Sequence, residues 1–401
     1  MKIGWFTPFD PGSAVGDYSE AVIAGLSAAG DEVTVFATEA PAHGEPRPSR
    51  FPVIRPAPPL PPSFLERLGR FDLLVFSLCS SPPDHRTVAE VAARRPGLVV
   101  LHDLALLQPA LRRCLGVVVH SDYALRRVRE AVAAPSAKID LPLCGPAVRL
   151  AARLPAPARP AHDRVRLLTV GDIAPQRMVH ATLRAIRRSD LLREQVSYRV
   201  IGKTADESYA QRLQSLVRLY GLGGEVELAE GPPAEALAGA DVVISLRNPD
   251  LGDNPAGLID SLVAGLPTVV WDHGFFGDFP ADVVCKISLE EEIGPLLERL
   301  VGDLGRRQEL GRAARAYALE RFHSGRYCER FRAFAEQALR HGPLLGLVDH
   351  VSDRLLELGT EPMDGLAERL AAELSLFAPD EERPAAPARA RVPQIPEALA
   401  G

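Results

Sequence analysis

A loop near the middle of the chain carries residue types that suit phosphate binding. Residues 171–177, Gly-Asp-Ile-Ala-Pro-Gln-Arg, follow an apolar strand-like run and precede a helical pattern. The first turn of a helix offers unpaired backbone N–H groups and a partial positive charge to an anion, and an arginine adds charge-assisted hydrogen bonds. We therefore expect Arg177 to contact a diphosphate. The alternative interpretation is an arginine at a helix start that simply faces solvent.

A second candidate site lies in residues 240–274, whose pattern predicts a strand, a polar glycine-rich loop, a helix, a turn and another strand. Asp253 would stand at the start of that helix and Asp260 about two turns later. The two carboxylates could then address different parts of one extended ligand. The alternative is that Asp253 only caps the helix and that Asp260 is solvated.

Parallel strands are expected to position both loops. Short, mostly apolar runs alternate with helical patterns through both halves of the chain, which is typical of parallel strands covered on both faces. Besides the strand that ends the stretch 240–274, the predicted strands cover residues 2–8, 32–37, 73–76, 98–101, 117–119, 165–170, 198–201, 225–228 and 241–246. The expected fold class is α/β, with two doubly wound Rossmann-like domains. In such sheets ligands bind outside the carboxyl ends of the strands, so we expect the active site in a central cleft between the domains.

Proline-rich segments set the predicted boundaries. Residues 41–63 are too rich in proline for a helix or a central strand, so we expect an irregular surface excursion there. A second cluster near residues 154–160 separates a domain over residues 1–155 from a domain over residues 156–343. Residues 344–401 are expected to form a helical extension, with helices at 347–358 and 364–377 and a disordered Pro/Ala-rich end.

The composition excludes several other classes of protein. With 46% hydrophobic and 24% charged residues, the chain is expected to be globular. Its five scattered cysteines suggest neither a disulfide framework nor a zinc-binding pattern, which fits a reducing cytoplasm. No signal peptide and no transmembrane segment is expected. The net charge is −6 although the first half is basic, so peripheral contact with an anionic membrane stays open, and no nucleic-acid partner is expected.

Five stretches of the sequence together resemble one family of enzymes. Residues 5–20 are similar to its Trp-Phe-x-Pro…Gly-x-Asp-Tyr-Ser-Glu opening, residues 101–104 to its Leu-His-Asp-Leu motif, and residues 117–123 to its Val-Val-His-Ser-(Glu/Asp)-Tyr element. Residues 246–253 match Leu-Arg-x-Pro-x-x-Gly-(Glu/Asp), and residues 262–270 keep the Ala-x-Gly-x-Pro-Val pattern. Through these motifs the first 335 residues or so resemble the retaining family 4 glycosyltransferases of the GT-B fold, especially one bacterial branch.

The resemblance implies roles for residues on the donor side of the cleft. Arg177 matches the lysine that neutralises the donor diphosphate, and Asp260 matches the carboxylate that binds the ribose hydroxyls. Asp253 matches a catalytic acidic residue in the loop that holds the donor sugar and turns backbone amides toward phosphate. The other members of the predicted donor-binding set in this region are Asn254, Ala256, Gly257 and Leu258.

On the acceptor side, the resemblance implies that the loop of Gly12 and Ser13 lies under the phosphates and that His102 is a catalytic residue near the anomeric carbon. His120 keeps the ordinary interpretation of a structural histidine at a strand end. The implied reaction moves a sugar from a nucleoside diphosphate sugar to an unidentified acceptor, with retention of anomeric configuration. Attack on the face of the leaving group, with a phosphate oxygen accepting the acceptor proton, needs no dedicated nucleophile.

No metal or cofactor is expected, because the sequence contains no Asp-x-Asp motif, and fixed positive charge with helix N-termini can assist departure of the diphosphate.

The chain departs from the family at Asp172, where many members carry a second phosphate-binding arginine, and in a short segment at residues 106–117, where acceptors bind. Two further interpretations therefore stay open. One is a non-catalytic GT-B protein that holds another enzyme, with the C-terminal extension as a contact surface. The other is a nucleotide-sugar epimerase or phosphorylase.

Overall fold

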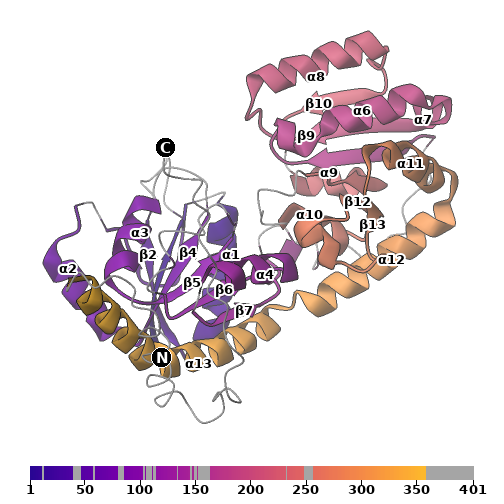
Figure 1. The fold of residues 1–401 in the computed structure, drawn as a ribbon. Coiled ribbons are helices and arrows are strands. Elements are labelled where there is room, and N and C mark those ends of the chain that lie inside the picture. Colours follow the sequence, from indigo (N-terminus) through magenta and orange to yellow (C-terminus); the bar gives the residue numbers. More distant parts are fainter. Residues whose placement is uncertain are drawn as a thin grey trace. The chain divides into compact units, whose positions relative to one another are not determined.

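Two separate parallel sheets, each covered by helices, form the framework of the chain (Figure 1). The computed structural model describes residues 1–10, 13–38, 47–56, 59–79, 85–102, 104, 111, 114–132, 134–144, 147–148, 151, 163–231, 233–247 and 256–357. The chain divides into one compact unit over Met1–Ala335, which contains both sheets, and a second unit from Glu336 onward. None of the described helices is long and apolar enough to cross a membrane.

The first sheet has seven strands in the order β3-β2-β1-β4-β5-β6-β7, all paired in parallel. They are β1 Lys2–Thr7, β2 Glu32–Ala37, β3 Val53–Ile54, β4 Leu73–Leu78, β5 Leu98–Leu101, β6 Gly116–Val119 and β7 Ser136–Lys138. Every residue of β4, β5 and β6 is buried, which explains why these strands are apolar except for Ser77. The strand order reverses between β1 and β4, as in a doubly wound sheet.

The second sheet has six parallel strands in the order β10-β9-β8-β11-β12-β13, with its reversal between β8 and β11. They are β8 Val165–Val170, β9 Val196–Ile201, β10 Val226–Ala229, β11 Val242–Ile244, β12 Thr268–Trp271 and β13 Cys285–Ile287. Tyr198, Leu213 and Leu297 are fully buried members of its hydrophobic core. Each sheet thus brings the carboxyl ends of neighbouring strands to one edge, where ligands of such folds bind.

Helices connect the strands of both sheets. Ser13, Ser121, Ser189, Asp206 and Asp303 each cap a helix by accepting a hydrogen bond from a backbone N–H of the first turn. The helices are α1 Ala14–Ala28, α2 Pro62–Arg67, η1 Leu68–Arg70, α3 His85–Arg94, α4 Asp122–Ala131, η3 Pro175–Arg177, α6 Val179–Arg188, α7 Asp190–Gln195, α8 Glu207–Tyr220, α9 Pro233–Gly239, α10 Ala256–Val263, η5 Gly274–Asp278, η6 Glu290–Glu292, α11 Ile293–Gly302, α12 Leu304–Arg321 and α13 Ser324–Glu357. Around the second sheet, α6 packs against α7, α8 and α11, whereas α10 packs against α12.

The two doubly wound sheets and the C-terminal helix confirm the predicted fold class. The excursion predicted for residues 41–63 is wrong in part, because β3 lies within it and α2 begins there at Pro62, where a helix tolerates proline. The edge strands β7 and β13 have no predicted counterpart, because their sequences, Ser-Ala-Lys and Cys-Lys-Ile, form no apolar run. The helix predicted at 347–358 is the last part of the longer α13. The boundary at residue 155 and the helix predicted at 364–377 lie outside the described residues, so these remain predictions.

Candidate functional site

The predicted phosphate loop follows β8 directly. The carboxyl end of the paired strand β9 lies beside its start. Gly171 has a φ of 119°, which favours glycine, and a Cβ on Gly202 would lie 2.5 Å from the carbonyl carbon of Gly171. The two loops therefore cross with almost no space between their backbones. A short helical turn, η3, then places Arg177, and Met178 follows it with a φ of 50°, a left-handed conformation that is rare for a non-glycine residue. Backbone strain of this kind often accompanies functional sites.

The side chain of Arg177 folds back over Gly171. A Cβ at Gly171 would lie only 2.6 Å from Cζ of Arg177, so the absence of a side chain at residue 171 makes room for the guanidinium. Burial lowers the pKa of Arg177, and the nearby Asp172 carboxylate offsets part of this effect. Asp172 itself is exposed. The solvated-arginine alternative is therefore wrong, because Arg177 is half-buried at the edge of the sheet.

Arg247 is a second cation at this edge, to which the sequence motifs assigned no role. It follows β11, the neighbour of β8 in the sheet, three residues after Ile244. Its pKa is lowered to about 9, first by burial and then by the positive charge of Arg177, while Asp172 acts in the opposite direction. The positive charge of Arg177 thus acts on Arg247, and Asp172 offsets part of this repulsion. The available signal was the Leu246-Arg247 pair within one of the matched motifs.

Substitution of Gly171 with alanine tests whether the glycine makes room for Arg177. We expect Gly171→Ala to lower the free energy of unfolding by roughly 1–3 kcal/mol and also to abolish binding of nucleoside diphosphates. Gly221 is the matched control, because it has a φ of 67° but no described heavy atom lies within 4 Å of the position that a Cβ would take there. Gly221→Ala should cause a similar loss of stability and leave binding intact, as measured by chemical denaturation and calorimetry. Equal binding by both variants would contradict this role of Gly171.

The helix α10 contains four of the predicted donor-binding residues, Ala256, Gly257, Leu258 and Asp260. Gly257 is exposed, whereas the side chain of Leu258 is buried in the core, which leaves its backbone as the part that could face a donor. Asp260 is 7% exposed, so the alternative of a solvated carboxylate is wrong.

A buried cysteine locates Asp260 more closely. The pKa of Cys144 is raised to about 12 by burial, then by the charges of Asp260 and Asp17, so both carboxylates lie near this thiol. Asp17 belongs to α1, whereas Asp260 belongs to α10. The remaining donor-side residues, Asp253 and Asn254, and Gly12 of the first sheet lie outside the described residues, and their roles remain predictions.

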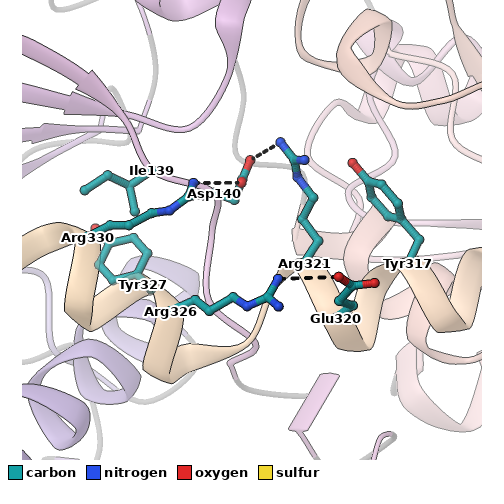
Figure 2. A pocket seen from close by; sticks show the side chains of 8 residues that line it. All are labelled: Ile139, Asp140, Tyr317, Glu320, Arg321, Arg326, Tyr327 and Arg330. Atoms are coloured by element: carbon teal, nitrogen blue, oxygen red, sulfur yellow. Dashed lines mark hydrogen bonds and ion pairs between the residues drawn. The ribbon is translucent and has the colours of Figure 1, made fainter.

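A cavity of about 160 Å³ lies between the end of β7, α12 and α13 (Figure 2). Asp140 accepts a hydrogen bond from Arg321 at 3.0 Å and forms an ion pair with Arg330 at 3.6 Å. Arg326 pairs with Glu320 at 3.7 Å. The three arginines of this cavity are thus paired with acidic groups of the protein itself, and none of the predicted site residues lines it. We therefore do not assign the donor to this cavity.

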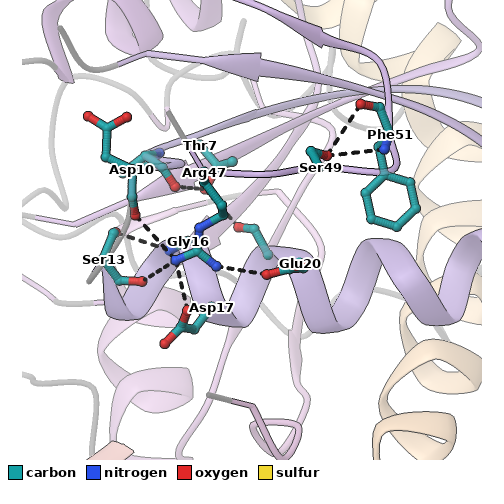
Figure 3. A network of polar contacts seen from close by, with 11 residues as sticks. Thr7, Asp10, Ser13, Gly16, Asp17, Glu20, Arg47, Ser49 and Phe51 are labelled. Carbon is teal, nitrogen blue, oxygen red and sulfur yellow. Dashed lines mark hydrogen bonds and ion pairs between the residues drawn. The ribbon is translucent and has the colours of Figure 1, made fainter. Parts of the chain in front are cut away.

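At the edge of the first sheet, Ser13 caps α1, with its Oγ accepting a hydrogen bond from the N–H of Gly16 at 3.1 Å. Arg47, which no sequence motif singled out, covers the same helix end (Figure 3). Its guanidinium donates to Asp17 at 2.7 Å and to Glu20 at 2.8 Å, and also to the carbonyls of Asp10 and Ser13. Arg47 thus fixes the loop before α1 in which the predicted Ser13 contact lies.

His102 directly follows β5, and His120 directly follows the adjacent strand β6. Both imidazoles are buried, and their ring centroids are 5.2 Å apart. Burial lowers the pKa of His120 to about 4, so this ring is neutral at neutral pH. Its Nδ1 donates a hydrogen bond to the carbonyl of Ile139 at 2.9 Å. The structure therefore brings the predicted catalytic histidine beside a second histidine that is held in one tautomer.

Comparison with known proteins supports the fold. No protein-family model matches the sequence, and no curated protein matches it. Among solved structures, HepE from Anabaena in complex with UDP is 16% identical with a TM-score of 0.63, covering 84% of this chain and 100% of that chain. Sucrose-phosphate synthase from Thermosynechococcus elongatus is 16% identical with a TM-score of 0.62, covering 84% and 98%. A glycosyltransferase from Rickettsia africae is 11% identical with a TM-score of 0.65, covering 84% and 98%. At these identities the likeness shows the fold alone, and that fold is GT-B.

Proposed function

We propose that the protein is a glycosyltransferase that moves a sugar from a nucleoside diphosphate sugar to an acceptor, with retention of anomeric configuration. The observation that carries this proposal is the pair of Arg177 and Arg247 beside Gly171 at the carboxyl edge of the second sheet. Guanidiniums form charge-assisted, often bidentate hydrogen bonds with phosphate oxygens, which suits the pair to a diphosphate. The proposal also draws support from HepE, a protein of the same fold that was solved with UDP and with UDP-glucose.

The proposed chemistry needs few groups from the protein. The bond between the anomeric carbon and the phosphate oxygen breaks while a bond to the acceptor oxygen forms on the same face, and the acceptor proton passes to the departing phosphate. Arg177 and Arg247 stabilise the negative charge that develops on the leaving diphosphate. His102 and Asp253 are proposed to hold the reacting sugar.

We also propose a cytoplasmic location, for which the scattered cysteines are the support.

Thermal unfolding with a panel of uridine, guanosine and adenosine diphosphates and their sugars tests the proposal. A ligand at 100 times its dissociation constant adds roughly 2.7 kcal/mol to stability, so one nucleotide series should clearly raise the melting temperature. That series would identify the base, and product formation with its sugar would then be followed by mass spectrometry. A panel without any shift at millimolar ligand would refute the donor site.

A non-catalytic GT-B partner protein is the second candidate, and Asp172 is the observation that favours it. Its carboxylate lies close enough to Arg177 and Arg247 to affect the pKa of both, so it could neutralise them without a ligand. The two candidates differ in the variant Asp172→Asn. A transferase should bind the nucleoside diphosphate more tightly once this competing anion is removed. A partner protein should lose stability through the exposed repulsion of the arginines and still bind no nucleotide.

Metal removal gives a further prediction. Because fixed guanidiniums take the role that a divalent cation would have, we expect the transfer rate to be unchanged, within about twofold, after dialysis against EDTA. Rates would be measured with and without added Mg²⁺ and Mn²⁺ at the same ionic strength. Loss of activity with EDTA and its recovery with one metal ion would show that the arginine pair is not sufficient.

A further inference from the structure

The ring of His102 packs against two other aromatic rings, those of His120 and Tyr18, which also contact each other with centroids 5.6 Å apart. In the pairing of β5 with β6, Leu98 matches Gly116 and Val100 matches Val118, so continuation of this register places His102 opposite His120. The ring of Tyr18 in α1 also contacts His102, edge to face, with ring centroids 4.7 Å apart and ring planes at 81°. Two ring contacts therefore help to orient His102, in addition to its place at the strand end.

Each of these two rings is fixed in turn by a hydrogen bond outside the pair. His120 donates to the carbonyl of Ile139. The hydroxyl of Tyr18 shares a hydrogen bond with the hydroxyl of Tyr327, 309 residues further along the chain. Burial raises the pKa of both phenols, so both hydroxyls stay protonated at neutral pH and their contribution is to orientation.

Tyr327 is itself held firmly in the first turns of α13. It is 2% exposed, and its ring stacks on Phe331 at 6.0 Å, while Phe331 contacts Trp5 of β1 at 5.4 Å. The next residue, Cys328, packs so closely on α1 that a Cβ on Gly25 would overlap its sulfur. These contacts prevent the Tyr327 hydroxyl from following Tyr18 if that ring moves.

We propose that Tyr327 is a positioning residue for His102, acting through Tyr18. The inference rests on the proposed transferase function, in which His102 touches the reacting sugar. Without the Tyr327 hydroxyl, the ring of Tyr18 loses the hydrogen bond that anchors its far end, and the edge that faces His102 becomes free to tilt. The C-terminal helix thus contributes to a site built mainly by the first sheet.

The variant Tyr327→Phe keeps the ring and removes only the oxygen. We expect kcat to fall about tenfold with the donor KM within about twofold, because the two arginines proposed to bind the diphosphate belong to the second sheet. Tyr317→Phe is the matched control, since Tyr317 packs on Phe279 and Phe322. The second readout is independent of activity: the imidazole signal of His102 in ¹³C-histidine NMR, assigned with His102→Asn, should shift in Tyr327→Phe and stay in place in Tyr317→Phe.

The double variant Tyr18→Phe/Tyr327→Phe separates positioning from stability. Each single variant leaves one buried hydroxyl without its hydrogen-bond partner, which destabilises the fold. The double variant removes both hydroxyls and should recover part of the melting temperature. A positioning role predicts that kcat stays about tenfold low and that the His102 signal stays shifted. Recovery of kcat together with stability, or a His102 signal that Tyr327→Phe leaves unmoved, would overturn the inference. If the wild type transfers no sugar, the NMR comparison still decides the positioning role.

Discussion

Replacing Arg177 with alanine should weaken binding of the nucleoside diphosphate by roughly 10- to 150-fold, since a hydrogen bond to a charged group contributes about 1.5–3 kcal/mol. The unliganded variant should be as stable as the wild type or more so, because the change removes a partly buried cation that lowers the pKa of Arg247. Titration calorimetry and thermal unfolding without ligand measure the two effects.

Arg184 provides the control for this variant. It lies on the following helix, α6, and pairs with Glu290 at 2.7 Å, away from the phosphate loop. Arg184→Ala should leave binding within about twofold, because its guanidinium pairs with Glu290 and has no proposed contact with the diphosphate. If Arg177→Ala loses binding and unliganded stability together, Arg177 acts as a structural residue and the donor site lies elsewhere.

Replacing His102 with asparagine should reduce kcat about 100- to 1,000-fold while the donor KM changes little, as expected when a group acts mainly in the transition state. His102 is 4% exposed, so asparagine is preferred to alanine because it leaves a smaller cavity and keeps a polar group. Steady-state rates at saturating donor measure the effect. His323, exposed between α12 and α13, serves as the control, and His323→Asn should transfer sugar at the wild-type rate.

Should His102→Asn raise the donor KM and leave kcat unchanged, the histidine would contribute to ground-state binding rather than to the reaction. Should both constants stay at their wild-type values, His102 would be a structural residue of the strand end. That second outcome would also remove the premise of the positioning role of Tyr327, although it would leave the diphosphate site intact.

The sequence was sufficient to predict the inner strands of both sheets and the loop that follows β8, because hydrophobic periodicity and glycine placement are local properties. Arg177 could be predicted for that reason. The contribution of Arg247 could not, because it depends on β11 lying next to β8, a pairing of residues 75 positions apart that no local pattern reveals. Its motif was visible, but motif matching alone gave the arginine no role.

Other features of the candidate site were missed for related reasons. Arg47 reaches α1 from a segment without regular structure, so nothing in the sequence indicates its four partners around that helix end. The pairing of His102 with His120 needs the register of two strands, and a shift by one residue would separate the rings. Edge strands such as β7 escaped prediction because Ser136–Lys138 has no apolar run.

The packing of α13 on the first sheet has a consequence for synthesis of the protein on the ribosome. Phe331 covers Trp5, and the ring of Phe334 reaches so near Gly116 that a Cβ there would lie 2.9 Å from it. The first sheet is made from the earliest part of the chain, yet its core is closed by residues that emerge nearly 200 residues later, roughly 10 to 40 s at ordinary rates of translation. A nascent chain therefore carries an open apolar surface until its second sheet has been made, and the domain that is begun first is completed last.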